Sequence, residues 1–206
     1  SIQSYIVVLE ALKQAGFPVD RVQVTTLQAL SGAGYKALTN PDLKENVVPY
    51  IGGEEEKTEK EPLKIFGKVT DNGIEQSMGI NINAVCTRVP VVDGHTAVVH
   101  IGFADVVPTI DEFKSIISSF TAEPQSLHLP SAPKIPIIVL NEIDRPQPKL
   151  DRDLGNGMTV TVGRITDDTF FNIRFIGLSH NTVRGAAGGA ILMAELLAQK
   201  GFIHVE

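Results

Sequence analysis

The sequence contains a single cysteine, no excess of basic residues and no long apolar run. One thiol cannot form a disulfide within the chain, which favours a reducing compartment, and we expect the cytoplasm. The net charge is −6, with 18 Lys and Arg against 24 Asp and Glu, whereas a nucleic-acid binder needs a basic face. No segment reaches the roughly 18 apolar residues that span a bilayer, and no Cys and His residues cluster as zinc ligands do. We therefore expect no nucleic acid, membrane or metal among the partners.

The amino end, SIQSYIVVLEALKQAG, has neither the basic region nor the small-residue cleavage site of a secretory signal. It also lacks an initiator methionine and begins as though inside a helix, so we expect it to have been cut from a longer protein. A length of 206 residues favours one domain, residues 1–206. The apolar content of 43% and charged content of 20% are ordinary for an enzyme or a binding domain.

Hydrophobic spacing predicts helices and strands that mix without strict alternation. Apolar residues three and four positions apart, or glycine and capping residues at the ends, predict helices over 2–15, 54–67, 109–120 and 180–201. Alternating segments rich in β-branched residues predict strands over 21–28, 82–88, 95–104, 158–165 and 171–179. We therefore predict an α+β fold with a mixed, largely antiparallel sheet and helices packed on one face.

Residues 121–157 hold six of the twelve prolines. Such a tract could be a linker between domains. It also contains KIPIIVL, which is apolar enough to require burial. We therefore predict an ordered proline-rich arm instead of a flexible tether.

An arginine and a histidine stand at the two ends of a short turn in CTRVPVVDGH, residues 86–95. His95 is seven positions beyond Arg88, so in an unbroken strand the two side chains would point to opposite faces. A chain reversal at Pro90 and Asp93-Gly94 would bring them together. The planar fork of arginine suits a carboxylate, and histidine transfers protons near neutral pH. A surface hairpin with both polar ends in water is also consistent with this sequence.

Other segments are ambiguous in the same way. EEEKTEKE, residues 54–61, is typical of a solvated helix surface with ion pairs, although Glu54 and Lys57 lie one turn apart and could hold an ammonium and an anion. The glycines at 31–34 and 185–190 permit either close packing or close approach of a ligand. Cys86 shares an apolar strand face, where a thiol keeps its proton, so we predict that it is inert.

Taken together, five segments resemble the aspartate-semialdehyde dehydrogenase family in its archaeal and fungal branch, over essentially the whole chain. In chain order they are TTLQALSGAG, NVVPYIGGEEEKTEKEPLKIFG, CTRVPVVDGH, RPQPKLDRD and HNTVRGAAGGA. The resemblance implies a carboxy-terminal catalytic and dimerisation domain with a fold like that of glyceraldehyde-3-phosphate dehydrogenase. Malonyl-CoA and succinyl-CoA reductase-like paralogues share much of the pattern and remain an alternative, as does a dimerisation module without catalysis.

The resemblance also implies a reaction and residue roles. The family uses NADPH to reduce L-aspartyl 4-phosphate to L-aspartate 4-semialdehyde through a cysteine thioester, in the biosynthesis of lysine, threonine, methionine and isoleucine. His95 would be the general acid and base, and Gln28 would orient the substrate at the reacting carbon. Arg88 would bind the α-carboxylate, Glu54 the α-amino group and Lys57 the phosphate.

For the cofactor, the resemblance implies that Ser31, Gly32, Ala33 and Asn181 border NADP near its nicotinamide. The helix over 180–201 would pack on an amino-terminal nucleotide-binding domain that these 206 residues do not include.

The nucleophilic cysteine of the family lies just before the first helix of this chain, and Cys86 aligns with a non-catalytic cysteine. We therefore expect the 206 residues alone to be inactive and to bind NADP weakly or not at all. The resemblance further implies a homodimer or homotetramer, formed through the sheet face and the arm over 121–157.

Overall fold

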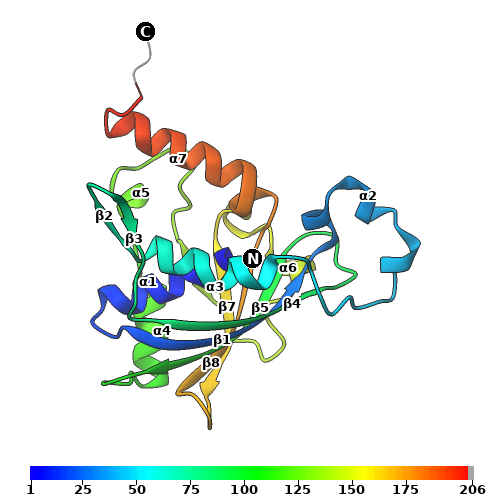
Figure 1. Ribbon diagram of the computed structural model, residues 1–206, viewed down its shortest axis with the longest axis horizontal. Coiled ribbons are helices and arrows are strands. Elements are labelled where there is room, and N and C mark those ends of the chain that lie inside the picture. The colour runs from blue at the N-terminus through cyan, green and yellow to red at the C-terminus, as the bar shows by residue number, and fades with distance from the viewer. Residues whose placement is uncertain (204–206) are drawn as a thin grey trace.

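The computed structural model describes residues 1–203 of the chain. Its centre is a six-stranded sheet with the strand order β4-β1-β5-β8-β7-β6 (Figure 1). The strands are β1 (Val19–Gln28), β4 (Asn81–Arg88), β5 (His95–Phe103), β6 (Ile137–Val139), β7 (Val160–Asp167) and β8 (Ile173–Ser179). β1 is parallel to β4 and β6 is parallel to β7, whereas the other neighbours are antiparallel. The mixed, largely antiparallel sheet predicted from the sequence is confirmed.

The helices differ widely in length and position. The α-helices of the described residues are α1 (Ile6–Gln14), α2 (Tyr35–Leu38), α3 (Glu54–Ile65), α4 (Ile110–Ser119), α5 (Glu123–Ser126), α6 (Pro148–Asp151) and α7 (Gly188–Gln199). Figure 1 shows α2 in a lobe that projects to one side of the sheet. Two short strands, β2 (Lys68–Thr70) and β3 (Gly73–Glu75), form a separate hairpin that the sequence pattern did not predict. Within residues 1–203, none of the helices combines the length and the apolar character needed to cross a membrane.

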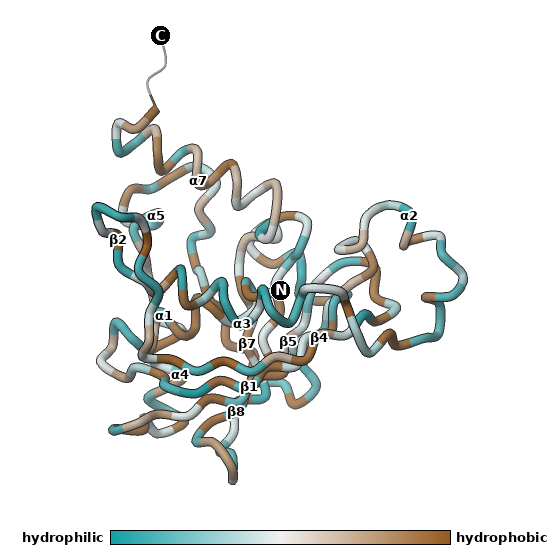
Figure 2. Tube along the Cα trace, in the orientation of Figure 1, coloured by the Kyte–Doolittle hydropathy of each residue, from teal (hydrophilic) through white to brown (hydrophobic). Residues whose placement is uncertain are grey.

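One face of the sheet carries the hydrophobic core. Alternate residues of the strands point to this face, for example Val22 and Val24 of β1, and both are buried. α1 packs there through a stripe of buried residues, Ile6, Val8, Leu9, Ala11 and Leu12. On α4, the ring centroid of Phe113 lies 5.8 Å from that of Phe175 of β8, so both helices cover the same face. Hydrophobic colour follows these strands and α1 in Figure 2.

α3 keeps its helical path through Pro62, although a proline inside a helix commonly kinks or ends it. Proline has no N–H to donate to the carbonyl four residues earlier, which belongs to Thr58. In the structure the Tyr5 hydroxyl donates to this carbonyl oxygen instead, at 3.4 Å. The lost helical bond is therefore replaced from a neighbouring element, and the helix runs on to Ile65.

The proline-rich tract packs on the core, whereas the last helix does not. Residues 121–157 contain α5, α6 and the edge strand β6, whose Ile137 is buried in the core. The predicted helix over 180–201 begins with a π-turn, η5 (Val183–Ala187), before α7. α7 has no buried residue, and Figure 1 shows it standing apart from the sheet.

Candidate active site

The strand ends bring Gln28, Arg88 and His95 together. Gln28 and Arg88 end the parallel strands β1 and β4 and lie opposite each other in the register. The chain then reverses through residues 89–94, which also bond the segment after β1, and His95 opens β5 beside β1. All three side chains are buried, with exposed fractions of 2%, 8% and 5%.

The arginine and the histidine face the same point in space. A Cβ built on Gly32 would lie 2.9 Å from Arg88 Nη1 and 2.9 Å from His95 Cε1. Gly32 belongs to η2 (Leu30–Ala33), the turn that directly follows β1. The chain reversal that would bring Arg88 and His95 together therefore exists. The two side chains are not the solvated ends of a surface hairpin.

The backbone of Ala29 holds both of these side chains. Its N–H donates to His95 Nδ1 at 3.1 Å, and its carbonyl oxygen accepts from Arg88 Nη1 at 2.8 Å. Burial lowers the pKa of His95, and the positive charge of Arg88 lowers it further. Burial also lowers the pKa of Arg88, while the nearby Glu54 carboxylate opposes that shift.

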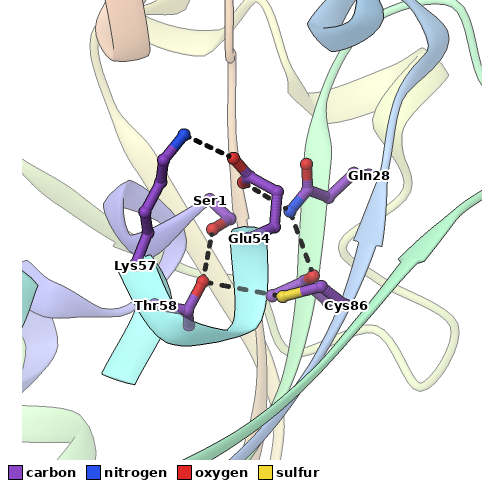
Figure 3. Close-up of polar contacts among 7 residues, drawn as sticks. Ser1, Gln28, Glu54, Lys57, Thr58 and Cys86 are labelled. Atoms are coloured by element: carbon purple, nitrogen blue, oxygen red, sulfur yellow. Dashed lines mark hydrogen bonds and ion pairs between the residues drawn. The ribbon is translucent and has the colours of Figure 1, made fainter. Parts of the chain in front are cut away.

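A carboxylate from α3, Glu54, joins Gln28 and Lys57 in a polar group (Figure 3). Glu54 Oε2 accepts from Gln28 Nε2 at 3.2 Å, and Glu54 Oε1 accepts from Lys57 Nζ at 3.3 Å. Burial alone would raise the pKa of Glu54, but the hydrogen bonds from Gln28 and Lys57 prevail and lower it. Glu54 is therefore a carboxylate at neutral pH. The side chain of Lys57 is 63% exposed and reaches the group only through Glu54.

A cavity of about 260 Å³ lies beside His95. Its lining residues are Ser1, Ile2, Gln3, Gly32, Glu61, His95, Ser179, Asn181 and Gly185. Of the predicted site residues, only Gly32, His95 and Asn181 line it. Those outside its lining are Gln28, Ser31, Ala33, Glu54, Lys57 and Arg88. A larger cavity of about 670 Å³ lies between the arm and η5, and Lys134 is its one charged lining residue. The smaller cavity, which is lined by His95 and Glu61, is therefore the candidate active site.

Asn181 is hydrogen-bonded to Ser31, and both are predicted cofactor residues. Its Oδ1 accepts from the Gly94 N–H at 2.8 Å, and its Nδ2 donates to Ser31 Oγ at 2.8 Å. Neither Asn181 nor Thr182 uses its side chain to cap the helical turn that follows. The Asn181 side chain instead fixes η2 to the turn that precedes β5.

Cys86 lies outside this cavity. It has no exposed surface, and its Sγ lies 3.6 Å from Thr58 Oγ1. A dashed line marks this contact in Figure 3. Thr58 Oγ1 in turn lies 3.1 Å from Ser1 Oγ. The thiol is thus packed between α3 and β4. Among residues 1–203, no three metal-binding side chains come close enough to hold an ion.

Sequence reasoning missed two features of α3. Glu61 lies two helical turns beyond Glu54 and lines the cavity, and this spacing on one helix face could have revealed it. Glu55 and Glu59 accept from the backbone N–H groups of Cys86 and Ala84, at 3.1 and 3.0 Å, on the edge strand β4. The charge run is therefore only partly a solvated surface.

A family model described as semialdehyde dehydrogenase, dimerisation domain, matches residues 9–184. This chain belongs to the semialdehyde dehydrogenase family. Among its relatives, the aspartate-semialdehyde dehydrogenase of Schizosaccharomyces pombe is 45% identical over 207 residues, covering 98% of this chain and 58% of that protein. The aspartate-semialdehyde dehydrogenase of Methanothermobacter thermautotrophicus is 46% identical over 183 residues, covering 88% and 52%.

Solved structures agree with these sequence relatives. The crystal structure of aspartate semialdehyde dehydrogenase with NADP from Candida albicans has a TM-score of 0.87 and 39% identity, and covers 97% of this chain. The match extends over 56% of that protein, so the chain spans a little over half the length of these relatives. The family resemblance and the fold class predicted from the sequence are confirmed.

Proposed function

We propose that this chain is the carboxy-terminal catalytic and dimerisation part of an NADP-dependent aspartate-semialdehyde dehydrogenase. That enzyme would convert L-aspartyl 4-phosphate to L-aspartate 4-semialdehyde in the cytoplasm, for the biosynthesis of aspartate-derived amino acids. The observation that carries the proposal is that Arg88 and His95 are both bonded to the Ala29 backbone and converge on Gly32. The Glu54 carboxylate lies near enough to influence the charge of Arg88 and accepts from Gln28.

The charges of this centre suit an α-amino acid. Arg88 uses Nη1 on Ala29, and its other guanidinium donors are left for a carboxylate. Glu54 is ionised and can accept from an ammonium. A malonyl or succinyl group carries no ammonium, so the acyl-CoA alternative gives Glu54 no substrate contact. Lys57, on an exposed and flexible side chain, would bind the phosphate after leaving Glu54.

The residues at the cavity fit the nicotinamide end of NADP. Gly32 and Gly185 present no side chain, and Asn181 Nδ2 keeps a second hydrogen after its bond to Ser31. We propose that Ser31, Gly32 and Asn181 hold the carboxamide ring, with Ala33 at its border. A cavity of about 260 Å³ gives no cradle for the adenosine half. The bound cofactor supplies the hydride, while Gln28 and His95 orient and polarise the reacting group.

The proposed oligomer would form through apolar surfaces that the described residues leave uncovered. The matched family model describes a dimerisation domain. We propose that the sheet face opposite the core, together with the arm over 121–157, forms a homodimer or homotetramer; this face carries half-buried residues such as Leu27 and Val98 and the exposed Val85. The uncovered α7 would pack on a nucleotide-binding domain.

The test is NADP reduction in the presence of L-aspartate 4-semialdehyde and phosphate. We expect turnover from the longer protein that carries this chain and none from the 206 residues alone, because Cys86 is buried away from the cavity. Turnover of the 206 residues above a blank without enzyme would show that the nucleophile is misassigned. Reduction of an acyl-CoA in preference to aspartyl phosphate would favour the reductase alternative.

A further inference from the structure

We propose that Ser4 is a positioning residue for His95, because its hydroxyl group holds the main chain from which the imidazole projects. Ser4 is the last residue of η1 (Ile2–Ser4), the 3-10 helix that precedes α1, and it lies 91 positions from His95 in the sequence. The catalytic consequence rests on the proposed function, in which His95 acts on the reacting group. The contact itself does not depend on that function.

The Ser4 hydroxyl group meets the main chain at the start of β5. Its Oγ donates to the His95 carbonyl oxygen at 2.8 Å, and β5 begins at His95. Ser4 has no exposed surface, and His95 is buried as well. A buried carbonyl group that loses its donor is left unsatisfied, which is unfavourable. The bond therefore fixes the backbone of His95 where the chain enters the strand.

A second serine orients the Ser4 hydroxyl group. Ser179 Oγ lies 3.1 Å from Ser4 Oγ, and Ser179 of β8 is the register partner of His95. A hydroxyl group has one hydrogen, and a carbonyl oxygen can only accept. Because the Ser4 hydrogen goes to the His95 carbonyl oxygen, the hydrogen between the two serines comes from Ser179. The three groups therefore form a directed chain of hydrogen bonds that ends on His95.

The sheet leaves room for the main chain of Ser4. Gly177 of β8 and Ala97 of β5 are register partners, so their α-carbons carry side-chain positions on the same face. A Cβ built on Gly177 would collide with the Ser4 carbonyl oxygen. Small residues at both positions therefore let the backbone of Ser4 approach the strands closely. The position of Ser4 is set by its main chain as well as by its hydroxyl group.

His95 is therefore held at two places. The Ala29 N–H donates to Nδ1 of its ring at 3.1 Å, and Ser4 holds its main chain. The ring faces Gly32, where a Cβ would lie 3.0 Å from Nε2, and His95 lines the cavity. A group that acts on a substrate must be held within about 0.5 Å of its working position, and a misplacement of about 1 Å costs on the order of 10²-fold in rate. We therefore expect catalysis to depend on the Ser4 hydroxyl group, although Ser4 does not line the cavity.

NMR of the histidine side chains tests the contact without any assay of activity. In the longer protein that carries this chain, without substrate, the His95 ring signals are assigned by their loss in His95→Asn. We expect Ser4→Ala to shift these signals and to leave those of the exposed His128 in place. Ser119→Ala is the matched control, because this exposed serine bonds only within α4, and it should shift neither set. Unchanged His95 signals in a folded Ser4→Ala would overturn the proposal.

Steady-state kinetics test the consequence for the proposed reaction. Ser4→Ala should lower kcat on the order of 10-fold and leave KM within about twofold, because it misplaces His95 but changes no residue of the cavity lining. Ile117→Val, in the core on α4, should lower Tm without this loss of kcat. Parent kcat in Ser4→Ala, or the same loss of kcat in Ile117→Val, would overturn the positioning role.

Two further arms keep the outcomes distinct. If Ser4→Ala does not fold, Ser4→Cys gives the same two measurements, because a thiol fits a similar volume and is only a weak donor. A parent protein that does not act on L-aspartate 4-semialdehyde would overturn the proposed function. The NMR result would then still decide whether Ser4 holds His95.

Discussion

Replacing Gly32 with alanine would insert a methyl group between the two side chains on which the site depends. A Cβ there would lie 2.9 Å from Arg88 Nη1, 2.9 Å from His95 Cε1 and 3.0 Å from His95 Nε2. Non-bonded carbon atoms settle at about 3.5–4.0 Å, so each contact is short by roughly half an ångström or more. Gly32 is outside the left-handed backbone region, so the effect is steric alone.

Neither side chain can withdraw freely, because each is bonded to Ala29, at 2.8 Å for Arg88 and 3.1 Å for His95. Overpacking of this kind costs about 1–3 kcal/mol in the free energy of unfolding. If the guanidinium and the ring yield instead, a displacement of about 1 Å at reacting groups costs on the order of 10²-fold in rate. We therefore expect Gly32→Ala to lose stability, catalysis or both.

Urea unfolding followed by circular dichroism and steady-state kcat/KM of the proposed enzyme measure the two effects. Gly52→Ala is the matched control, because a Cβ at Gly52 meets nothing within 4 Å. It should leave kcat/KM unchanged and alter stability by no more than about 1 kcal/mol. If Gly32→Ala also kept parent stability within about 0.5 kcal/mol and parent kcat/KM, the placement of Arg88 and His95 around Gly32 would be refuted.

Three further changes probe the fold. Glu55→Ala leaves an N–H of the edge strand unpaired and should lower the free energy of unfolding by about 1 kcal/mol, whereas the exposed Glu56→Ala should not shift the urea midpoint; equal effects would contradict the strand contact. Gly177→Ala would drive a Cβ into the Ser4 carbonyl oxygen, so Tm should fall, and a parent Tm would be inconsistent with this packing. Hydrogen bonds from backbone N–H groups of the following turn lower the pKa of Asp168 to about 2 from 3.8. Its contribution to the free energy of unfolding is therefore present above pH 3.8 and is lost as pH falls towards 2. Asp168→Asn should make the free energy of unfolding fall less steeply over this pH range, and an unchanged fall would contradict the assignment.

Much of the fold was predictable because local patterns carry it. The alternation in residues 82–88 and 95–104 predicted the strands now seen as β4 and β5, and Pro90 with Asp93-Gly94 predicted the reversal between them. The hairpin β2–β3 also had a signal, because its two-residue turn, Asp71-Asn72, consists of residues that favour turns.

The contacts that define the site were not predictable in the same way. The bond from Ala29 N–H to His95 Nδ1 depends on the register of β1 against β5, which no local pattern encodes. The use of Glu55 to satisfy an edge N–H depends on β4 lying beside α3. The side chain of Asn181 reaches Ser31, 150 positions away in sequence, and no local pattern encodes such a bond.

The most direct test of the account is the effect of Arg88→Lys on kcat/KM for L-aspartate 4-semialdehyde in the proposed enzyme. A lysine ammonium cannot both replace the 2.8 Å bond to Ala29 and make the paired donors that a carboxylate receives from arginine. Loss of a charge-assisted bond worth about 1.5–3 kcal/mol predicts a fall in kcat/KM of roughly 10- to 100-fold, with KM raised. A kcat/KM within about twofold of the parent would contradict the claim that Arg88 binds the substrate in a shared centre with His95 and Glu54.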